Sequence, residues 1–71
     1  MDTERMEMPI SEARANLTEL VASVRLLRRC VFLTRRDKPQ AALVPTELGE
    51  LVIEAGGAEA AIALLAKAVR G

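Results

Sequence analysis

The 71-residue sequence contains no histidine, tyrosine or tryptophan, and it has a single cysteine, Cys30, and a single phenylalanine, Phe32. One cysteine cannot form an intramolecular disulfide, and without histidine the usual His/Cys metal sites are excluded. Hydrophobic residues make up 51% of the chain, so the core must be built from Leu, Val, Ile and Ala. A domain of this size buries only ~60% of the surface of its unfolded chain. We therefore expect it to gain stability by oligomerisation.

Residues that serve catalysis are also scarce. Cys30 has no histidine to activate it, so we expect a buried, inert thiol. The acidic residues are scattered without a pair that converges, and the four glycines do not have the spacing of a phosphate-binding loop. We expect a protein that is not an enzyme, uses no cofactor or metal, and works by binding a partner.

The sequence contains no stretch that would direct it to a membrane. Its longest fully apolar run, Ala60 to Ala66, is far shorter than the roughly 20 residues of a membrane-spanning helix. The first eight residues, MDTERMEM, contain acids and lack the apolar segment of a signal peptide. We expect a cytoplasmic protein.

Charge is unevenly distributed, although the formal net charge is zero. Residues 1–45 contain eight basic and six acidic side chains, whereas residues 46–71 contain two basic and four acidic ones. The basic residues concentrate between Arg25 and Lys38, a range that contains six basic residues and one acidic residue, Asp37. A local cluster of this kind is typical of surfaces that attract a phosphate backbone.

The first half of the chain predicts a strand followed by a long helix. Residues 6–10 form the strand, and Pro9, which lacks an N–H group, confines it to an edge or an end. Ser11 is expected to cap the helix, which ends near Leu26 or Leu27. One stripe of apolar residues at 4-3-4-3 spacing indicates the buried face: Ala13, Leu17, Leu20, Val24 and Leu27.

The second half predicts a hairpin and two further helices. Residues 30–34 and 41–44 read as strands around the turn RRDKP, with Asp37 able to adopt a turn conformation. Thr46 is expected to cap a helix over residues 47–55, which two glycines end, and a last helix covers residues 58–70. Their apolar stripes comprise Leu48, Leu51, Val52 and Ala55, and Ala58, Ala61, Ile62, Leu65 and Val69. The order β-α-β-β-α-α predicts an α+β fold.

Two polar features each allow a simple and a functional interpretation. Ser11, Arg14, Thr18 and Arg25 share one side of the first helix, which is either a solvated face or a surface from which Arg14 reaches a base edge or a phosphate. Residues 34–38, TRRDK, either form a solvated hairpin tip or contact a DNA backbone. Arg28 and Arg29 lie near a helix C-terminus, where basic residues are favourable without any ligand.

Together, ISEARANLTELV and VFLTRRDKPQAALVP resemble the Phd/YefM (prevent-host-death) antitoxins of bacterial type II toxin–antitoxin modules. The resemblance covers residues 6 to about 52, roughly two thirds of the chain. The sequence departs from the family pattern at Asp37, where a turn glycine is usual, and at residues 25–29, RLLRR, where a glycine or acids are more common.

This resemblance implies a YefM-like fold, with a small sheet packed on helices, in a homodimer that binds operator DNA and represses its own operon. Residues 1–55 would form the DNA-binding and dimerisation domain, and residues 56–71 a helical segment that binds the cognate toxin, a small ribonuclease-type protein. The implied DNA-binding residues are Ser11, Arg14, Asn16, Thr34, Arg35, Arg36 and Lys38. The implied toxin-binding residues are Leu51, Val52, Ile53, Ile62, Leu64, Leu65 and Val69.

Two other functions remain open from the sequence. The chain could be a stand-alone DNA-binding regulator, whose last helix only completes its core or dimer. It could also be a protein-interaction module whose basic hairpin is merely solvated. Ribbon-helix-helix and swapped-hairpin DNA binders agree less well with the order of the elements.

Overall fold

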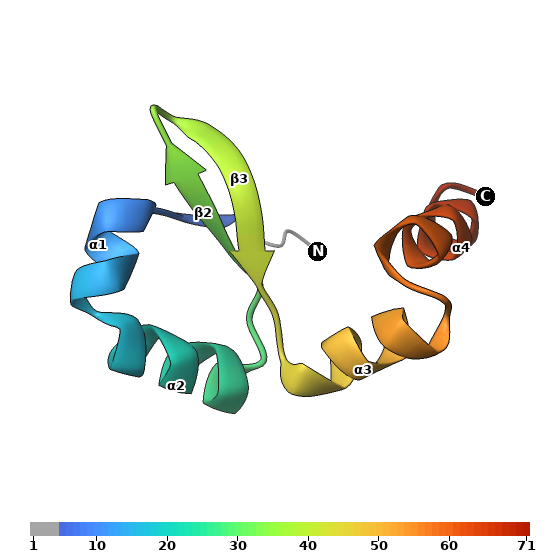
Figure 1. Cartoon of the computed structure of the whole chain (residues 1–71), viewed down its shortest axis with the longest axis horizontal. Coiled ribbons are helices and arrows are strands. Elements are labelled where there is room, and N and C mark those ends of the chain that lie inside the picture. The colour runs from blue at the N-terminus through green and yellow to red at the C-terminus, as the bar shows by residue number, and fades with distance from the viewer. Residues whose placement is uncertain (1–4) are drawn as a thin grey trace.

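The computed structural model describes residues 5–71, which form a three-stranded sheet and four helices (Figure 1). The elements are β1 (Met6–Pro9), α1 (Ile10–Ala15), α2 (Leu17–Leu27), β2 (Val31–Arg35), β3 (Lys38–Leu43), α3 (Thr46–Glu54) and α4 (Ala58–Arg70). The predicted α+β class is therefore confirmed. The order differs in one respect, because two helices stand where one was expected between the first two strands.

The sheet has β2 in its centre, between β1 and β3. β1 runs parallel to β2, with Met6 opposite Val31 and Pro9 opposite Thr34. β3 runs antiparallel to β2, and a register shift separates Leu33 from Thr34. The parallel pair requires a crossover connection, which α1 and α2 provide.

A small aliphatic core fills the space between this crossover and the sheet. Ala13, Leu20, Val24 and Val31 are buried, and Met8, Leu33 and Leu43 pack against them. The predicted stripe is thus correct in part. Leu17 and Leu27, expected in the core, are more than half exposed.

Asn16 interrupts the predicted single helix, with φ −126° and ψ 34°. Its side-chain Nδ2 donates a hydrogen bond to the backbone oxygen of Glu12 at 3.1 Å. Asparagine competes for backbone groups in this way and is unfavourable inside helices. Leu17 is the first residue of α2 after this break, and Leu27 is the last residue of the same helix, so both lie at helix ends and outside the core cluster.

Neither predicted helix cap is present in residues 5–71. α1 begins at Ile10, with Pro9 as its N-cap, so Ser11 lies inside the helix and makes no capping hydrogen bond. α3 likewise begins at Thr46 after Pro45. In both places the fixed φ of the proline, −59°, sets the entry to the helix before the hydroxyl residue is reached.

The hairpin turn is tighter than the sequence predicted. Arg36 and Asp37 alone connect β2 to β3, both with positive φ, 54° and 64°, as the favoured two-residue hairpin turns of type I′ require. The expected turn conformation of Asp37 is confirmed. Arg35 pairs with Lys38, and Pro39 lies inside β3 opposite Thr34, which is permitted because β3 is an edge strand.

Cys30 is exposed, so the expectation of a buried thiol was wrong. It lies in the connection between α2 and β2, immediately before the inward-facing Val31. Strand side chains alternate between the two faces of a sheet, and the buried positions begin one residue after the cysteine.

α3 and α4 extend away from the sheet and from the α1–α2 side of the molecule (Figure 1). Gly56 and Gly57, with φ of 109° and 111°, form the turn between them. α3 has no buried residue, and α4 buries Ala61. We call residues 46–70 the helical arm. None of the helices in residues 5–71 has the length and hydropathy needed to cross a membrane.

Candidate nucleic-acid interface and apolar arm

One hollow on the surface joins the two motifs that the sequence singled out. It has a volume of about 410 Å³ and is lined by Pro9, Ile10, Ser11, Arg14, Thr34, Arg35 and Arg36. We call it the basic hollow. Nineteen residues lie between the SEAR segment and the TRR segment in sequence, yet both line this one depression.

The parallel pairing of β1 with β2 explains this proximity. Pro9, the last residue of β1, lies beside Thr34 near the end of β2. Parallel strands end at the same edge of the sheet, so α1 starts where the hairpin tip begins. Arg14 thus comes from the helix that follows one strand, while Arg35 ends the other strand and Arg36 lies in the turn that follows it.

The basic hollow carries three arginines that are free to meet a ligand. Arg14, Arg35 and Arg36 are all exposed. Within residues 5–71, the ion pairs of the structure are Arg5–Glu7 and Arg28–Glu47. None of the three arginines therefore has its charge neutralised by a carboxylate of the described chain.

The other predicted DNA-binding residues have less uniform positions. Ser11 is exposed on the rim, but Thr34 is only 6% exposed and lies in the floor of the hollow. Lys38 is exposed on the first residue of β3, directly across from Arg35. Asn16 lies apart, in a second depression lined by residues 14–19, where its amide is engaged with Glu12.

Pro9 and Ile10 line the basic hollow and were not among the predicted site residues. Their position immediately before Ser11 is the signal that could have identified them. A strand that ends at Pro9 places the start of the next helix at the edge of the sheet, beside the site. They provide apolar contact area beside the arginines.

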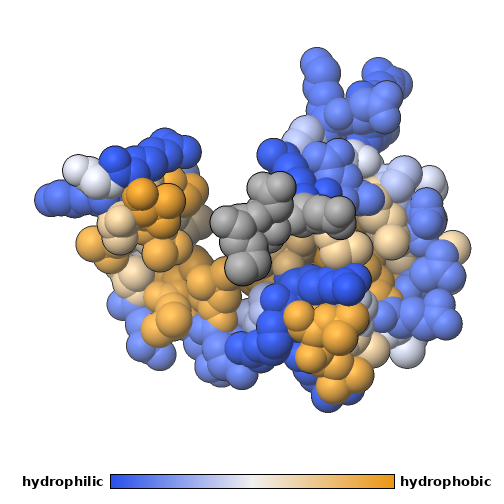
Figure 2. Space-filling view, turned by 180° about the vertical axis from the view of Figure 1, so that it is seen from behind, coloured by the Kyte–Doolittle hydropathy of each residue, from blue (hydrophilic) through white to orange (hydrophobic). Residues whose placement is uncertain are grey.

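The helical arm presents a large apolar surface. Six of the seven predicted toxin-binding residues are between 51% and 80% exposed, and Val52 is partly buried. These six are Leu51, Ile53, Ile62, Leu64, Leu65 and Val69. Figure 2 shows the hydrophobic surface gathered over the arm, in contrast to the hydrophilic hairpin tip.

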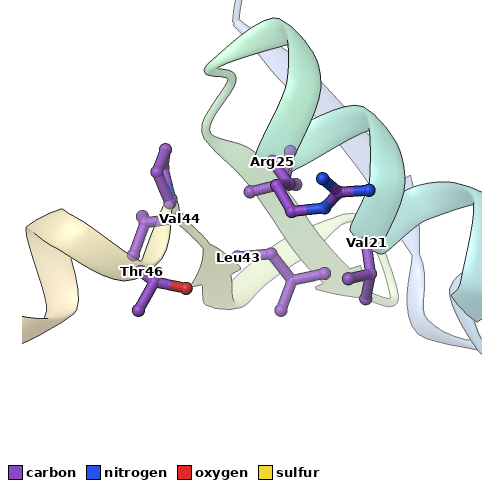
Figure 3. Close-up of a pocket in the computed structure, with 7 residues that line it drawn as sticks. Val21, Arg25, Leu43, Val44 and Thr46 are labelled. Carbon is purple, nitrogen blue, oxygen red and sulfur yellow. The ribbon is translucent and has the colours of Figure 1, made fainter.

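An apolar hollow of about 120 Å³ lies where α2 meets the connection from β3 to α3. Figure 3 shows Val21 and Arg25 of α2 across from Leu43, Val44 and Thr46. Val21 and Leu17, four residues apart on α2, are about half exposed. Together they give the sheet-bearing part of the molecule an apolar surface separate from the arm.

An ion pair connects α2 to the arm. A guanidinium nitrogen of Arg28, Nη1, donates to Oε1 of Glu47 at 3.0 Å. Arg28 ends α2 in the left-handed conformation, with φ 57°, a role usually taken by glycine. A hydrogen bond from the backbone of Glu47 and the pairing with Arg28 lower the pKa of this exposed carboxyl.

Residues 5–71 contain no group of three or more Cys, Asp or Glu side chains placed to hold a metal ion. The described surface offers a basic hollow that suits an anionic polymer and apolar surfaces that suit proteins. Comparison of the chain with protein-family models, curated proteins and solved structures finds no significant match.

Proposed function

We propose that this chain is the antitoxin of a type II toxin–antitoxin module of the Phd/YefM kind. As a homodimer it would repress its own operon by binding operator DNA, and it would neutralise a cognate toxin through its helical arm. The observation that carries the proposal is the basic hollow, in which the two segments that resemble the family contribute three arginines that form no ion pair within residues 5–71.

The geometry of the hollow supports binding to a duplex rather than a solvated charge cluster. Arg35 and Arg36 lie at a projecting hairpin tip, where they can contact phosphates on the DNA backbone. Arg14 lies on a helix beside that tip, and an arginine in this position can reach a guanine edge with both guanidinium nitrogens. In this assignment the tip provides affinity and Arg14 provides sequence preference.

The apolar surface around Leu17, Val21 and the hollow of Figure 3 supports dimerisation of the sheet-bearing part. A two-fold dimer would present two basic hollows to two half-sites of a palindromic operator. It would also supply the burial that a monomer of this size lacks.

The arm supports the toxin-binding half of the proposal. If α4 only completed the core of a stand-alone regulator, its large apolar side chains would be buried, but Ala61 is the residue that α4 buries. An amphipathic helix with exposed Ile, Leu and Val side chains is suited to a groove on another protein. The toxin, a small ribonuclease-type protein, would cover this face.

Operator binding tests the DNA half directly. The DNA upstream of the chain's own gene is titrated in a gel-shift assay with the wild type and with Arg14→Ala and Arg35→Ala. We expect Arg14→Ala to weaken binding by about ten-fold or more, consistent with ~1–3 kcal/mol for a good base contact. Arg35→Ala should also weaken binding, through the loss of a phosphate contact. Arg70→Ala, which removes one charge from the arm, is the matched control and should bind normally. Equal affinity in all four proteins would refute the assignment.

Co-expression of the chain with the product of the adjacent reading frame tests the toxin half. We expect the wild type to rescue growth, and a variant with Ile62→Glu and Leu65→Glu to fail while it still binds the operator. A neighbouring protein without toxicity would favour the stand-alone regulator instead.

A further inference from the structure

One stripe of the arm has the spacing of a helix-pairing seam. Ala58, Ile62, Leu65 and Val69 follow one another at intervals of four, three and four residues, the a/d spacing of coiled coils. All four are exposed, and Val69 is 80% exposed. Ala61, the buried residue of α4, lies outside this set, so the contact of α4 with its own chain leaves the seam uncovered.

We propose that in the free protein this seam is covered by the same seam of a second copy, with the two α4 helices antiparallel. Antiparallel pairing places Ala58 opposite Val69 of the second copy, and Ile62 opposite its Leu65. The pattern matches itself in this direction because its intervals read four, three, four from both ends. Each pair at the ends combines a small and a larger residue, and each central pair combines two large aliphatic ones.

The charges of the arm favour the same orientation. α4 has Glu59 in its first turn and Lys67 and Arg70 in its last, and Glu54 ends α3 shortly before α4 begins. In an antiparallel pair, the basic end of each α4 lies beside the acidic end of the other. The helix dipoles are also complementary in this arrangement, whereas parallel pairing would place like charges together.

Such a cover would also stabilise the α4 helix. A free helix of 13 residues is marginal in water, and most helical stability in proteins comes from packing of the apolar face. α4 buries only Ala61 among residues 58–70 and α3 buries none. Pairing of two arms would provide the missing burial.

The pairing goes beyond toxin binding but shares part of its surface. Ile62, Leu65 and Val69 are also assigned to the toxin, so pairing and neutralisation would compete; this competition, unlike the pairing itself, rests on the proposed function. Leu64 and Ile53 lie off the seam and remain exposed in the pair. A toxin could begin to bind there before the arms separate.

Sedimentation velocity of the full chain, without toxin or DNA, tests the pairing. Leu65→Glu introduces a charge into the seam, and Leu64→Glu is the matched control on the adjacent, equally apolar position. We expect Leu65→Glu to weaken self-association by about ten-fold or more and Leu64→Glu to sediment as the wild type does. Identical behaviour of both variants, whether changed or unchanged, would overturn the proposal. Association of the sheet-bearing part contributes equally to all three proteins, so only the difference between Leu65→Glu and Leu64→Glu reports on the seam.

Disulfide trapping tests the orientation in a Cys30→Ser background, which removes the exposed native thiol. Chains with Ala58→Cys and chains with Val69→Cys are oxidised alone and mixed. The antiparallel pair separates the two copies of residue 58 by ~16 Å along the helices, too far for a disulfide. We therefore expect cross-links in the mixture and none with Ala58→Cys alone. Cross-linking of Ala58→Cys with itself would overturn the orientation. Both experiments omit the toxin, so neither result depends on whether the chain neutralises one.

Discussion

Arg28 and Glu47 join the end of α2 to the first turn of α3 across a distance of 3.0 Å between Nη1 and Oε1. Nineteen residues separate them in sequence, and the β-hairpin lies between. The pair thus connects the sheet-bearing part of the molecule to the helical arm. Both side chains are more than half exposed, so we expect the pair to influence the position of the arm more than the stability of the fold.

The first prediction concerns the pH dependence of this contact. The pKa of Glu47 is lowered from its ordinary value of 4.5 by a backbone hydrogen bond and by Arg28. A carboxyl with a lowered pKa in the folded state stabilises that state above the ordinary pKa, and the contribution is lost as the pH falls through the lowered value. We expect the Arg28–Glu47 contact to persist at neutral pH and to break below pH 4.5.

Nuclear magnetic resonance titration of the Glu47 carboxyl checks this prediction. Arg28→Gln should raise the pKa of Glu47 toward its ordinary value without restoring it fully, because the backbone hydrogen bond remains. Glu50, on the same helix, provides an internal comparison in both proteins. A Glu47 pKa unaffected by Arg28→Gln would show that the ion pair is absent in solution.

The second prediction separates the true core from the predicted stripe. Leu20 is 6% exposed and Leu27 is 57% exposed, although the sequence placed both in one apolar face. Leu20→Ala should lower the free energy of unfolding by ~2–5 kcal/mol, as buried leucine truncations do. Leu27→Ala should change it by less than ~1 kcal/mol. Chemical denaturation followed by circular dichroism measures both, and equal losses would show that Leu27 is buried as deeply as Leu20.

The third prediction concerns the hairpin turn. Arg36 and Asp37 both have positive φ, a conformation that costs most residues other than glycine ~1–2 kcal/mol. Asp37→Gly should therefore stabilise the fold modestly and bring the turn to the glycine usual in the Phd/YefM family. Asp37→Val should destabilise it, because a β-branched residue is poorly accommodated there. Thermal unfolding compares the two variants, and a lower melting temperature for Asp37→Gly would contradict the positive φ.

The fourth prediction divides the roles within the basic hollow and rests on the proposed DNA binding. Arg36→Ala should reduce the slope of log affinity against log salt by about one, as expected for the loss of a single phosphate contact. Arg14→Ala should instead weaken the preference for the operator over unrelated DNA. Gel shifts over a salt series on both DNAs measure the two quantities. A loss of sequence preference in Arg36→Ala but not in Arg14→Ala would reverse the assignment.

Much of the fold could be predicted from the sequence because its signals are local. The paired strands around Asp37 and the glycines after α3 are short-range patterns, and the structure contains the elements they indicate. The break at Asn16 was missed because the apolar spacing remains regular across it. Cys30 was misplaced because β2 begins at Val31, so the cysteine lies in the connection before the strand and its buried neighbour is the first strand residue.

The candidate site was only partly accessible to sequence reasoning. Arg14 and Arg36 could be named from their motifs, but their position around one hollow depends on the parallel pairing of Pro9 with Thr34. No periodicity reveals that pairing. The burial of Thr34 follows from the register of β2, which the pattern of apolar residues alone does not fix.

The two sides of β2 also differ in how they fold. Its pairing with β3 closes a two-residue turn, and hairpins of this kind form within about 1–10 µs. Its pairing with β1 must instead close the whole crossover through α1 and α2, and such non-local contacts form more slowly. We therefore expect the hairpin with Arg35 and Arg36 to form before Arg14 joins it. If the chain binds DNA as proposed, a partly folded chain would contact nucleic acid only through the hairpin tip, and sequence preference would require the final pairing of the first strand.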